Sequence, residues 1–215
     1  MEGAAVSLSP TLAPFSETEV VYCEAKAKQF RVKKGKIQSQ FTETIYEACI
    51  DYPFLLKGDD GYVVVCPEDS FVDIVNTFDV TNYSHKIGGI EARLPALPMQ
   101  QALHDAEVSF IEADGPVPID FMESSIKNGD RIFVLGMRYN DPEAIAQILE
   151  GHPIREKEKI VGIFRHSEGK KEGLYLAPGN RKQAVGELLK YGISFIIWST
   201  IIAAIATTVG IVSTL

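Results

Sequence analysis

The feature that most constrains this chain is the stretch 191–215, which holds twenty-five residues without a charged side chain. The hydrocarbon interior of a bilayer is about 30 Å thick, and a helix of this length rises about 37 Å. The polar residues of the stretch are Ser, Thr and Tyr, whose hydroxyl groups can bond back to their own helix. We therefore predict one transmembrane helix over 191–215, in preference to a buried core helix, which normally keeps a polar stripe.

The residues on either side of this stretch predict its orientation. Lys182 and Lys190 precede it and no basic residue follows it, as the positive-inside rule expects if residues 1–190 are cytoplasmic. Residues 1–18 contain no Lys or Arg and carry Pro10 and Pro14, so we expect neither a signal peptide nor a second span there. We predict a flexible N-terminal arm over 1–18 and a single-pass membrane protein.

Charge is unevenly distributed along the chain. Residues 155–190 hold nine Lys or Arg against five Glu, a balance of +4. The whole chain has a net charge of −8, so residues 1–154 carry −12. The basic segment 155–190 suits an anionic lipid surface, and we expect Arg181, Lys182 and Lys190 to contact lipid headgroups. No basic stripe with interleaved aromatic residues appears elsewhere, which argues against a nucleic-acid partner.

Residues 19–180 are expected to form one β-rich domain. Residues 19–32 alternate apolar and polar, as a half-buried strand does, and two apolar runs at 46–56 and 62–67 are joined by a Gly-containing hairpin loop. A further strand is predicted at 70–75, followed by an exposed excursion over 76–92. A short helix after Pro98 should run into another strand.

The second half continues in the same style and then becomes helical. A turn at Asn128-Gly129 should begin a strand from Arg131 to Tyr139, and Asp141 followed by Pro142 predicts a helix start. Residues 159–166 and 172–178 are predicted to form two strands that pair as a final hairpin. Asn180 should cap a juxtamembrane helix over 181–190 that continues into the span. The predicted fold class is α+β: a compact β-rich domain followed by a single C-terminal transmembrane helix.

No catalytic, metal or cofactor site is predicted. His85, His104, His152 and His166 follow no metal-binding spacing, and no phosphate-binding or nucleophile motif is present. We expect Cys23, Cys49 and Cys66 to be small apolar residues of strands rather than nucleophiles. Asn82 begins an Asn-x-Ser sequence that we regard as incidental in a cytoplasmic domain. Five acidic residues around one hairpin are better explained as protection of a strand edge than as a cation site: Asp59, Asp60, Glu68, Asp69 and Asp73.

Three stretches of the sequence resemble GIDE domains. Residues 22–24 look like a Tyr-x-Glu strand core, "YPFLLKGDDGYVVVCPEDSFVDI" resembles the family's Pro-Phe hairpin segment, and "ESSIKNGDRIFVLG" is similar to its later motif. The matching positions are Pro53, Phe54, Gly61, Glu123, Ile126, Gly129, Asp130, Leu135 and Gly136. Each also has a purely structural explanation, as a core, turn or close-approach residue.

The resemblance implies a membrane-bound domain rather than a particular reaction. GIDE domains occur in membrane-bound E3 ubiquitin ligases, whose chemistry belongs to a zinc-binding RING module after the last membrane helix. This sequence has three Cys and four His, and it has neither that module nor the family's N-terminal membrane helix. Ligase activity is therefore not expected from the residues present.

The predicted span carries two stripes of small residues. They recur every four residues and offer surfaces on which another helix can pack closely: Ser199, Ala203 and Thr207, and Ala206, Gly210 and Thr214. The partner would be another membrane protein or a second copy of the chain.

The favoured function is a membrane-anchored, non-catalytic interaction or scaffold module, or an accessory subunit of a membrane complex. One alternative is an adaptor in ubiquitin-like transfer, or an enzyme with a composite site. Another is a membrane-tethered ligand sensor.

Overall fold

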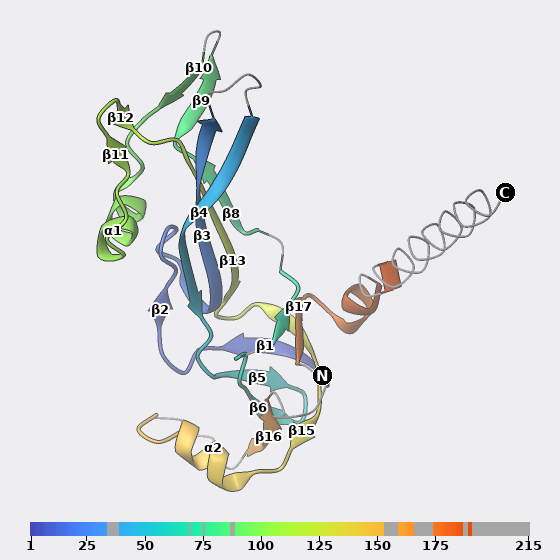
Figure 1. Cartoon of the computed structure of the whole chain (residues 1–215). Helices are drawn as coiled ribbons and strands as arrows, with labels where there is room; N and C mark the ends of the chain where they lie inside the picture. Colours follow the sequence, from blue (N-terminus) through green and yellow to red (C-terminus); the bar gives the residue numbers. More distant parts are fainter. Residues whose placement is uncertain are drawn as a thin grey trace, which may run out of the picture.

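The computed structural model describes residues 1–33, 39–68, 70–74, 76–86, 89–152, 159–165, 174–186 and 189–190. The chain forms two β-sheets joined end to end, with helices at the periphery (Figure 1). The prediction of a β-rich domain is thus confirmed. The predicted span, with its six candidate helix-contact residues from Ser199 to Thr214, lies outside the described residues. Within the described part, no helix is both long and apolar enough to cross a membrane.

Sheet A is a mixed sheet of eight strands. In order across the sheet they are β15 (Arg138–Tyr139), β16 (Ile160–Phe164), β6 (Gly61–Val65), β5 (Phe54–Gly58), β1 (Glu2–Val6), β14 (Arg131–Leu135), β17 (Tyr175–Pro178) and β7 (Phe71–Val72). The pairs β16–β6 and β17–β7 are parallel and the others antiparallel. The predicted hairpin β5–β6 is present, closed between Gly58 and Gly61.

Sheet B is built around the 15-residue strand β3 (Glu19–Lys33). Its order is β2 (Thr11–Leu12), β3, β13 (Ile119–Lys127) and β8 (Phe78–Thr81), and β4 (Ser39–Ile50) also pairs with β3. Two small ribbons are attached: β9 (Tyr83–Lys86) with β10 (Gly89–Ala92), and β11 (Ile111–Glu112) with β12 (Gly115–Pro116). Residues 76–92, expected as an excursion, therefore contain three strands, and β8 belongs to the sheet.

The helix predicted after Pro98 is present, and the predicted caps Asp141 and Asn180 are confirmed. Helix α1 (Leu97–Asp105) has Pro98 in its first turn, and α2 (Pro142–Ile148) begins at Asp141, whose Oδ1 accepts a hydrogen bond of 3.0 Å from the Ala144 amide. Residues 181–186 are helical, and Asn180 and Gln183 exchange side-chain to backbone hydrogen bonds there. These helix starts could be predicted from the sequence because a helix cap depends on residues that are close neighbours in the chain.

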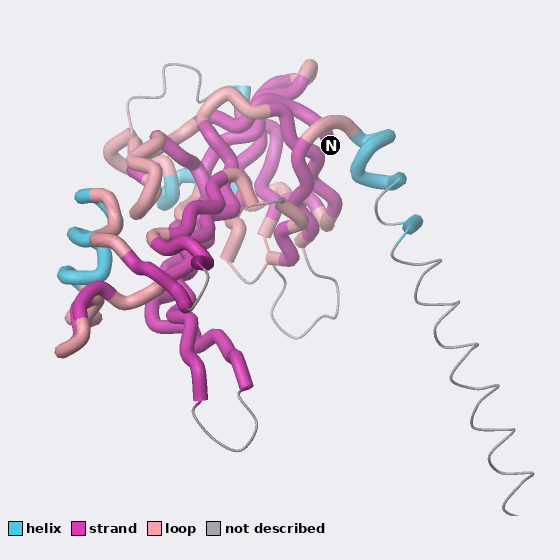
Figure 2. The backbone as a smooth tube through the Cα atoms, turned by 90° about the horizontal axis from the view of Figure 1, so that it is seen from above, coloured by secondary structure: helices cyan, strands magenta, loops and turns pink. Residues whose placement is uncertain are grey.

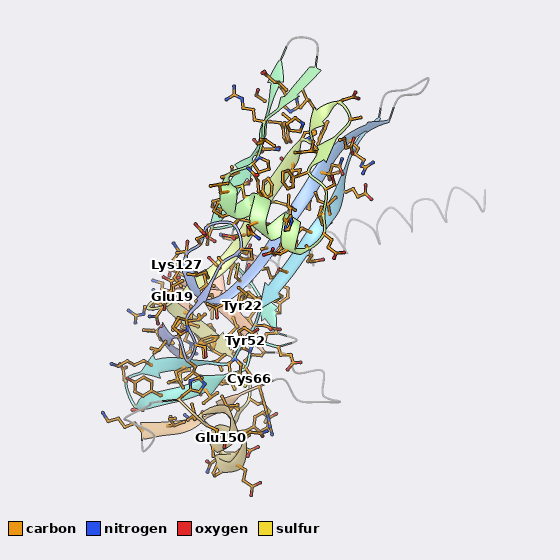
Figure 3. All side chains as sticks on the ribbon, turned by 90° about the vertical axis from the view of Figure 1, so that its left-hand side faces the viewer. Glu19, Tyr22, Tyr52, Cys66, Lys127 and Glu150 are labelled. Carbon is orange, nitrogen blue, oxygen red and sulfur yellow. The ribbon has the colours of Figure 1, made fainter. Side chains whose placement is uncertain are left out.

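Four apolar clusters are found among the described residues, the fourth being Phe133, Tyr175, Ala177 and Ala184. The first contains Phe54, Ile126 and Tyr22. Figure 3 labels Tyr22 where the two sheets meet. The second fills the inner face of sheet B beneath α1, around Phe121 and Leu103. The third packs α2 on the outer face of sheet A, the face that carries Leu55, Phe133 and Tyr175. The outer face is thus covered at one end by α2 and at the other by residues 181–186.

The prediction of a loose arm over 1–18 is wrong. Strand β1 lies between β5 and β14 in the middle of sheet A, with Ala5 opposite Leu56 and Gly3 opposite Ile132. A side chain at Gly3 would collide with the Lys57 carbonyl group, so glycine permits the close approach. Pro10 lies between β1 and β2 and Pro14 beyond β2, so neither interrupts pairing. The fold therefore begins well before Glu19.

The predicted final hairpin is also wrong. Strand β16 pairs with β6 and β15, whereas β17 pairs with β14 and β7. Similarly, the strand expected from Arg131 to Tyr139 is divided into β14 and β15 at Gly136, which packs on Leu174. Apolar alternation predicts strands but does not predict which strands become neighbours.

Candidate interaction surface

The residues that resemble the GIDE hairpin motif have structural positions. Phe54 is buried at the start of β5 in the cluster between the sheets, and Pro53 is half-buried beside it. Gly61 has a φ of 133°, and a side chain there would meet the Lys159 carbonyl oxygen. These positions support the hairpin and present no reactive group.

The later motif builds the turn between β13 and β14. The Asp130 carboxylate accepts a hydrogen bond of 2.8 Å from the Lys127 amide, and Gly129 has a φ of 91°. The Gly129 amide donates to the Ala5 carbonyl, and the Ala5 amide donates to the Asp130 carbonyl. The turn thereby holds β1 in sheet A. Ile126 is buried, whereas Leu135 is half-exposed on the outer face.

Glu123 differs from the other motif residues because it is a buried carboxylate, only 1% exposed. Its Oε1 accepts hydrogen bonds from the amides of Phe15 at 2.6 Å and Ser16 at 3.2 Å. Within the described structure its Oε2 has no hydrogen-bond partner. Glu123 therefore fastens the turn at residues 13–18 to the inner face of sheet B.

The Tyr-x-Glu pair of β3 is also joined by a hydrogen bond. The Tyr22 hydroxyl donates to Glu24 Oε1 at 2.6 Å, and burial together with this neighbour raises the pKa of Tyr22. Lys26 bonds Glu47 on the adjacent strand at 2.9 Å. These groups neutralise one another on the polar face of sheet B and form no reactive pair.

Asn82 is a structural hub that sequence reasoning missed. Its Nδ2 donates to the carbonyls of Arg93 and Val117, each at 2.8 Å, and its Oδ1 accepts from the Ile119 amide at 2.7 Å. It borders a cavity of about 330 Å³ that is also lined by Tyr83 and Arg93. Because the amide group is fully engaged by the backbone, it can neither accept a glycan in the folded domain nor orient a ligand in this cavity.

A larger groove runs along α1. Two adjoining hollows, of about 600 and about 670 Å³, share Glu17, Pro98 and Gln101. We call the surface formed by Leu12, Glu17, Tyr46, Leu97, Pro98 and Gln101 the α1 groove. Leu97 is 78% exposed and Leu12 59% exposed, so the groove presents apolar side chains to solvent. A third hollow, of about 650 Å³, extends it past His104 toward Glu107 and Ile111.

The groove has an acidic rim. Glu17, Asp105 and Glu107 line the three hollows, and none of the described residues that line them is Lys or Arg. Asp105 is held by Gln101, whose Nε2 donates to it at 2.6 Å. The arrangement favours a partner segment that combines apolar and basic side chains.

Two of these acidic residues have left-handed backbones. Glu17 has a φ of 52° and Glu107 a φ of 58°. Glu107 ends α1 in a Schellman arrangement, in which its amide donates to the His104 carbonyl and the Val108 amide donates to the Leu103 carbonyl. Glycine is the usual residue at such a position. No sequence signal marked these sites, because left-handed positions are recognised by Gly or Asn.

The buried thiol of Cys23 and the half-buried thiol of Cys66 make stability depend on alkaline pH. Burial, with the charge of Glu123 second, raises the pKa of Cys23 to about 12, and burial raises that of Cys66 to about 11. Because these thiols ionise earlier in the unfolded chain, their contribution to stability is complete below about pH 9 and is lost as pH rises toward 11–12. We expect the free energy of unfolding of the full chain in mild detergent, measured with urea, to fall above pH 9 by up to about 1.4 kcal/mol per pH unit and thiol. The decline should be shallower in Cys23→Ala, and a flat profile from pH 8 to 10 in the parent chain would contradict this assignment.

The described residues contain no group of three or more His, Cys, Asp or Glu side chains able to hold a metal ion. Asp59 and Asp60 lie at the β5–β6 turn, whereas Asp73 accepts a hydrogen bond from the Tyr175 hydroxyl at 2.9 Å. The structure brings none of the described histidines into such a group. His166 and Asp69 fall outside the described residues.

The three basic residues predicted to contact lipid lie at the end of the described chain. Arg181, Lys182 and Lys190 are exposed. The Arg181 amide donates to Glu2 Oε2 at 2.9 Å, which fixes the start of the helical segment to β1.

Comparison with family models, curated proteins and solved structures gave no match.

Proposed function

We propose that this chain is a membrane-anchored, non-catalytic interaction module that binds a basic and partly apolar segment of another protein in the α1 groove. The observation that carries the proposal is the groove itself, in which Leu12 and Leu97 are exposed beside Glu17 and which extends to Glu107. Exposed apolar side chains rimmed by polar residues are typical of protein–protein interaction sites.

The two left-handed glutamates support this assignment. An L-residue in this conformation costs about 1–2 kcal/mol relative to the right-handed helical one, a cost that glycine avoids. Strained residues of this kind cluster at functional sites. Their occurrence on the rim of one groove is explained if the carboxylates are needed to bind a partner.

The position of the groove agrees with a membrane anchor at 191–215. Helix α1 and residues 181–186 lie on opposite sides of the molecule (Figures 1 and 2). A domain held at its C-terminal end would therefore present the α1 groove away from the membrane. The resemblance to GIDE domains is consistent with this role.

A photocrosslinking amino acid at position 97 tests the proposal in the full chain within its native membrane. We expect a defined adduct with a partner protein from position 97 and none from position 150, where Glu150 lies exposed far from α1 (Figure 3). Glu17→Lys with Glu107→Lys should lower the yield about tenfold, which corresponds to about 1.4 kcal/mol. Asp59→Lys with Asp60→Lys, a matched double reversal at the β5–β6 turn, should not.

Glu107→Gly is expected to change partner binding and the stability of the fold in opposite directions. This substitution should raise the free energy of unfolding by about 1 kcal/mol, since glycine accepts the left-handed backbone without strain, while it lowers the crosslinking yield. Equal adducts from positions 97 and 150, or a yield that the charge reversals do not change, would exclude the α1 groove as the binding surface.

A further inference from the structure

An apolar patch lies on the outer face of sheet A, at the edge formed by β7. Tyr175 of β17 lies opposite Leu135 on one side and opposite Phe71 on the other, so these three side chains share one face. The Phe71 and Tyr175 rings are stacked, with centroids 5.8 Å apart. Phe71 is nevertheless 65% exposed and Leu135 50% exposed. We call the exposed side chains of Phe71 and Leu135, which flank Tyr175 on this face, the outer patch.

The helical residues 181–186 belong to the same face. Ala184 is buried against Phe133, Tyr175 and Ala177. Arg131 binds Glu2 Oε1 at 2.7 Å, and the other oxygen of Glu2 accepts from the Arg181 amide. The C-terminal segment is thereby fixed on the outer face, where Ala184 contacts Tyr175, the residue whose ring stacks on Phe71.

The rest of this segment adds apolar and basic side chains together. Val185 and Leu189 are exposed, as are Arg181, Lys182 and Lys190. The nearby acidic groups are engaged, because Glu2 is bonded as described and Asp73 accepts from Tyr175. Exposed apolar side chains beside Lys and Arg are typical of surfaces that lie in the headgroup region of an anionic bilayer.

Chain length limits how far this face can lie from the uncharged stretch. Seven residues lead from Ala184 to Tyr191, and even a fully extended chain of that length spans at most about 25 Å. The described residues 181–186 and 189–190 hold Arg181, Lys182 and Lys190 and no acidic side chain, so this end of the domain is suited to anionic lipid.

From these observations we infer that the outer patch lies on the membrane, with Phe71 and Leu135 in the interfacial region of an anionic bilayer and Arg181 and Lys182 at its headgroups. The inference rests on the membrane anchor of the proposed function. It adds that the domain lies against the bilayer through a defined face of sheet A.

The test uses the full chain reconstituted in vesicles of phosphatidylcholine with phosphatidylglycerol, containing a lipid with a nitroxide at a shallow depth. A small fluorescent amino acid replaces Phe71, Leu135 or, as the matched control, Leu97, an exposed leucine on the opposite side of the molecule. We expect strong quenching at positions 71 and 135 and none at 97. Arg181→Glu with Lys182→Glu should reduce quenching at 71 to the level at 97 while the chain still floats with the vesicles.

Three other results are possible, and each refutes either the membrane anchor or the membrane-facing position of the outer patch. A chain that does not float with the vesicles refutes the anchor, and with it the proposed function. If the chain floats but positions 71, 135 and 97 are quenched equally, the anchor stands and the membrane-facing patch is refuted. If position 71 is shielded without quenching, and only at high protein-to-lipid ratio, a second copy covers the patch and the inference is likewise refuted.

Discussion

Glu123→Ala is expected to lower the free energy of unfolding by about 3–5 kcal/mol, because it removes a buried carboxylate that accepts two backbone hydrogen bonds. The Phe15 and Ser16 amides would both lose their bond to Oε1, the first in a buried position and the second in a part-buried one. The turn at 13–18, which carries Glu17 of the α1 groove, would lose its attachment to β13. Urea unfolding of the full chain in mild detergent measures the loss.

Two further substitutions isolate the cause. Glu123→Gln keeps a carbonyl acceptor but puts an amide group where Oε2 has no described partner, so we expect a smaller loss of about 1–2 kcal/mol. Glu47→Ala, which removes an exposed carboxylate paired with Lys26 on the neighbouring strand, should cost less than about 1 kcal/mol. If Glu123→Ala were as mild as Glu47→Ala, the turn would be held by other contacts.

Asn82→Ala should cost about 3–4 kcal/mol, because it removes the side-chain partner of the buried Val117 carbonyl, the part-buried Arg93 carbonyl and the buried Ile119 amide. The loss should be strongest near residues 93 and 117–119, the backbone positions that Asn82 joins. Hydrogen exchange is expected to show faster exchange there and in α1, with smaller changes in sheet A.

The matched control is Asn76→Ala. Asn76 is exposed and accepts one hydrogen bond of 3.1 Å from Ser124, so its loss should cost less than about 1 kcal/mol. Equal effects at the two positions, or exchange that rises uniformly through both sheets, would show that Asn82 is not a local hub.

The parts of the fold that sequence analysis predicted correctly depend on local signals. The alternation of Val21, Cys23, Ala25 and Ala27 predicted β3, and Asp141 predicted the start of α2. Gly129 predicted the turn between β13 and β14. In each case the residue that carries the signal lies within a few positions of the structure it determines.

The incorrect predictions concern relationships between distant segments. Nothing in Glu2–Val6 states that it will lie between β5 and β14, and the apolar run of β16 does not reveal that β6 is its neighbour. The candidate site was missed for a related reason. Glu17 and Glu107 resemble ordinary surface glutamates until their backbone angles and the positions of Leu12 and Leu97 are known.

The place of β1 has a consequence for the order in which the molecule can be assembled. The amino group of Met1 donates to the Val134 carbonyl at 2.7 Å, across a sequence separation of 133 residues. During synthesis the first strand must therefore wait, unpaired on one side, until β14 has left the ribosome. Contacts of such long range are formed slowly, because the intervening chain must first be ordered. Sheet A is thus completed late, and a chaperone that shields residues 1–6 during this interval would act at the step where the nascent domain is most exposed to mispairing.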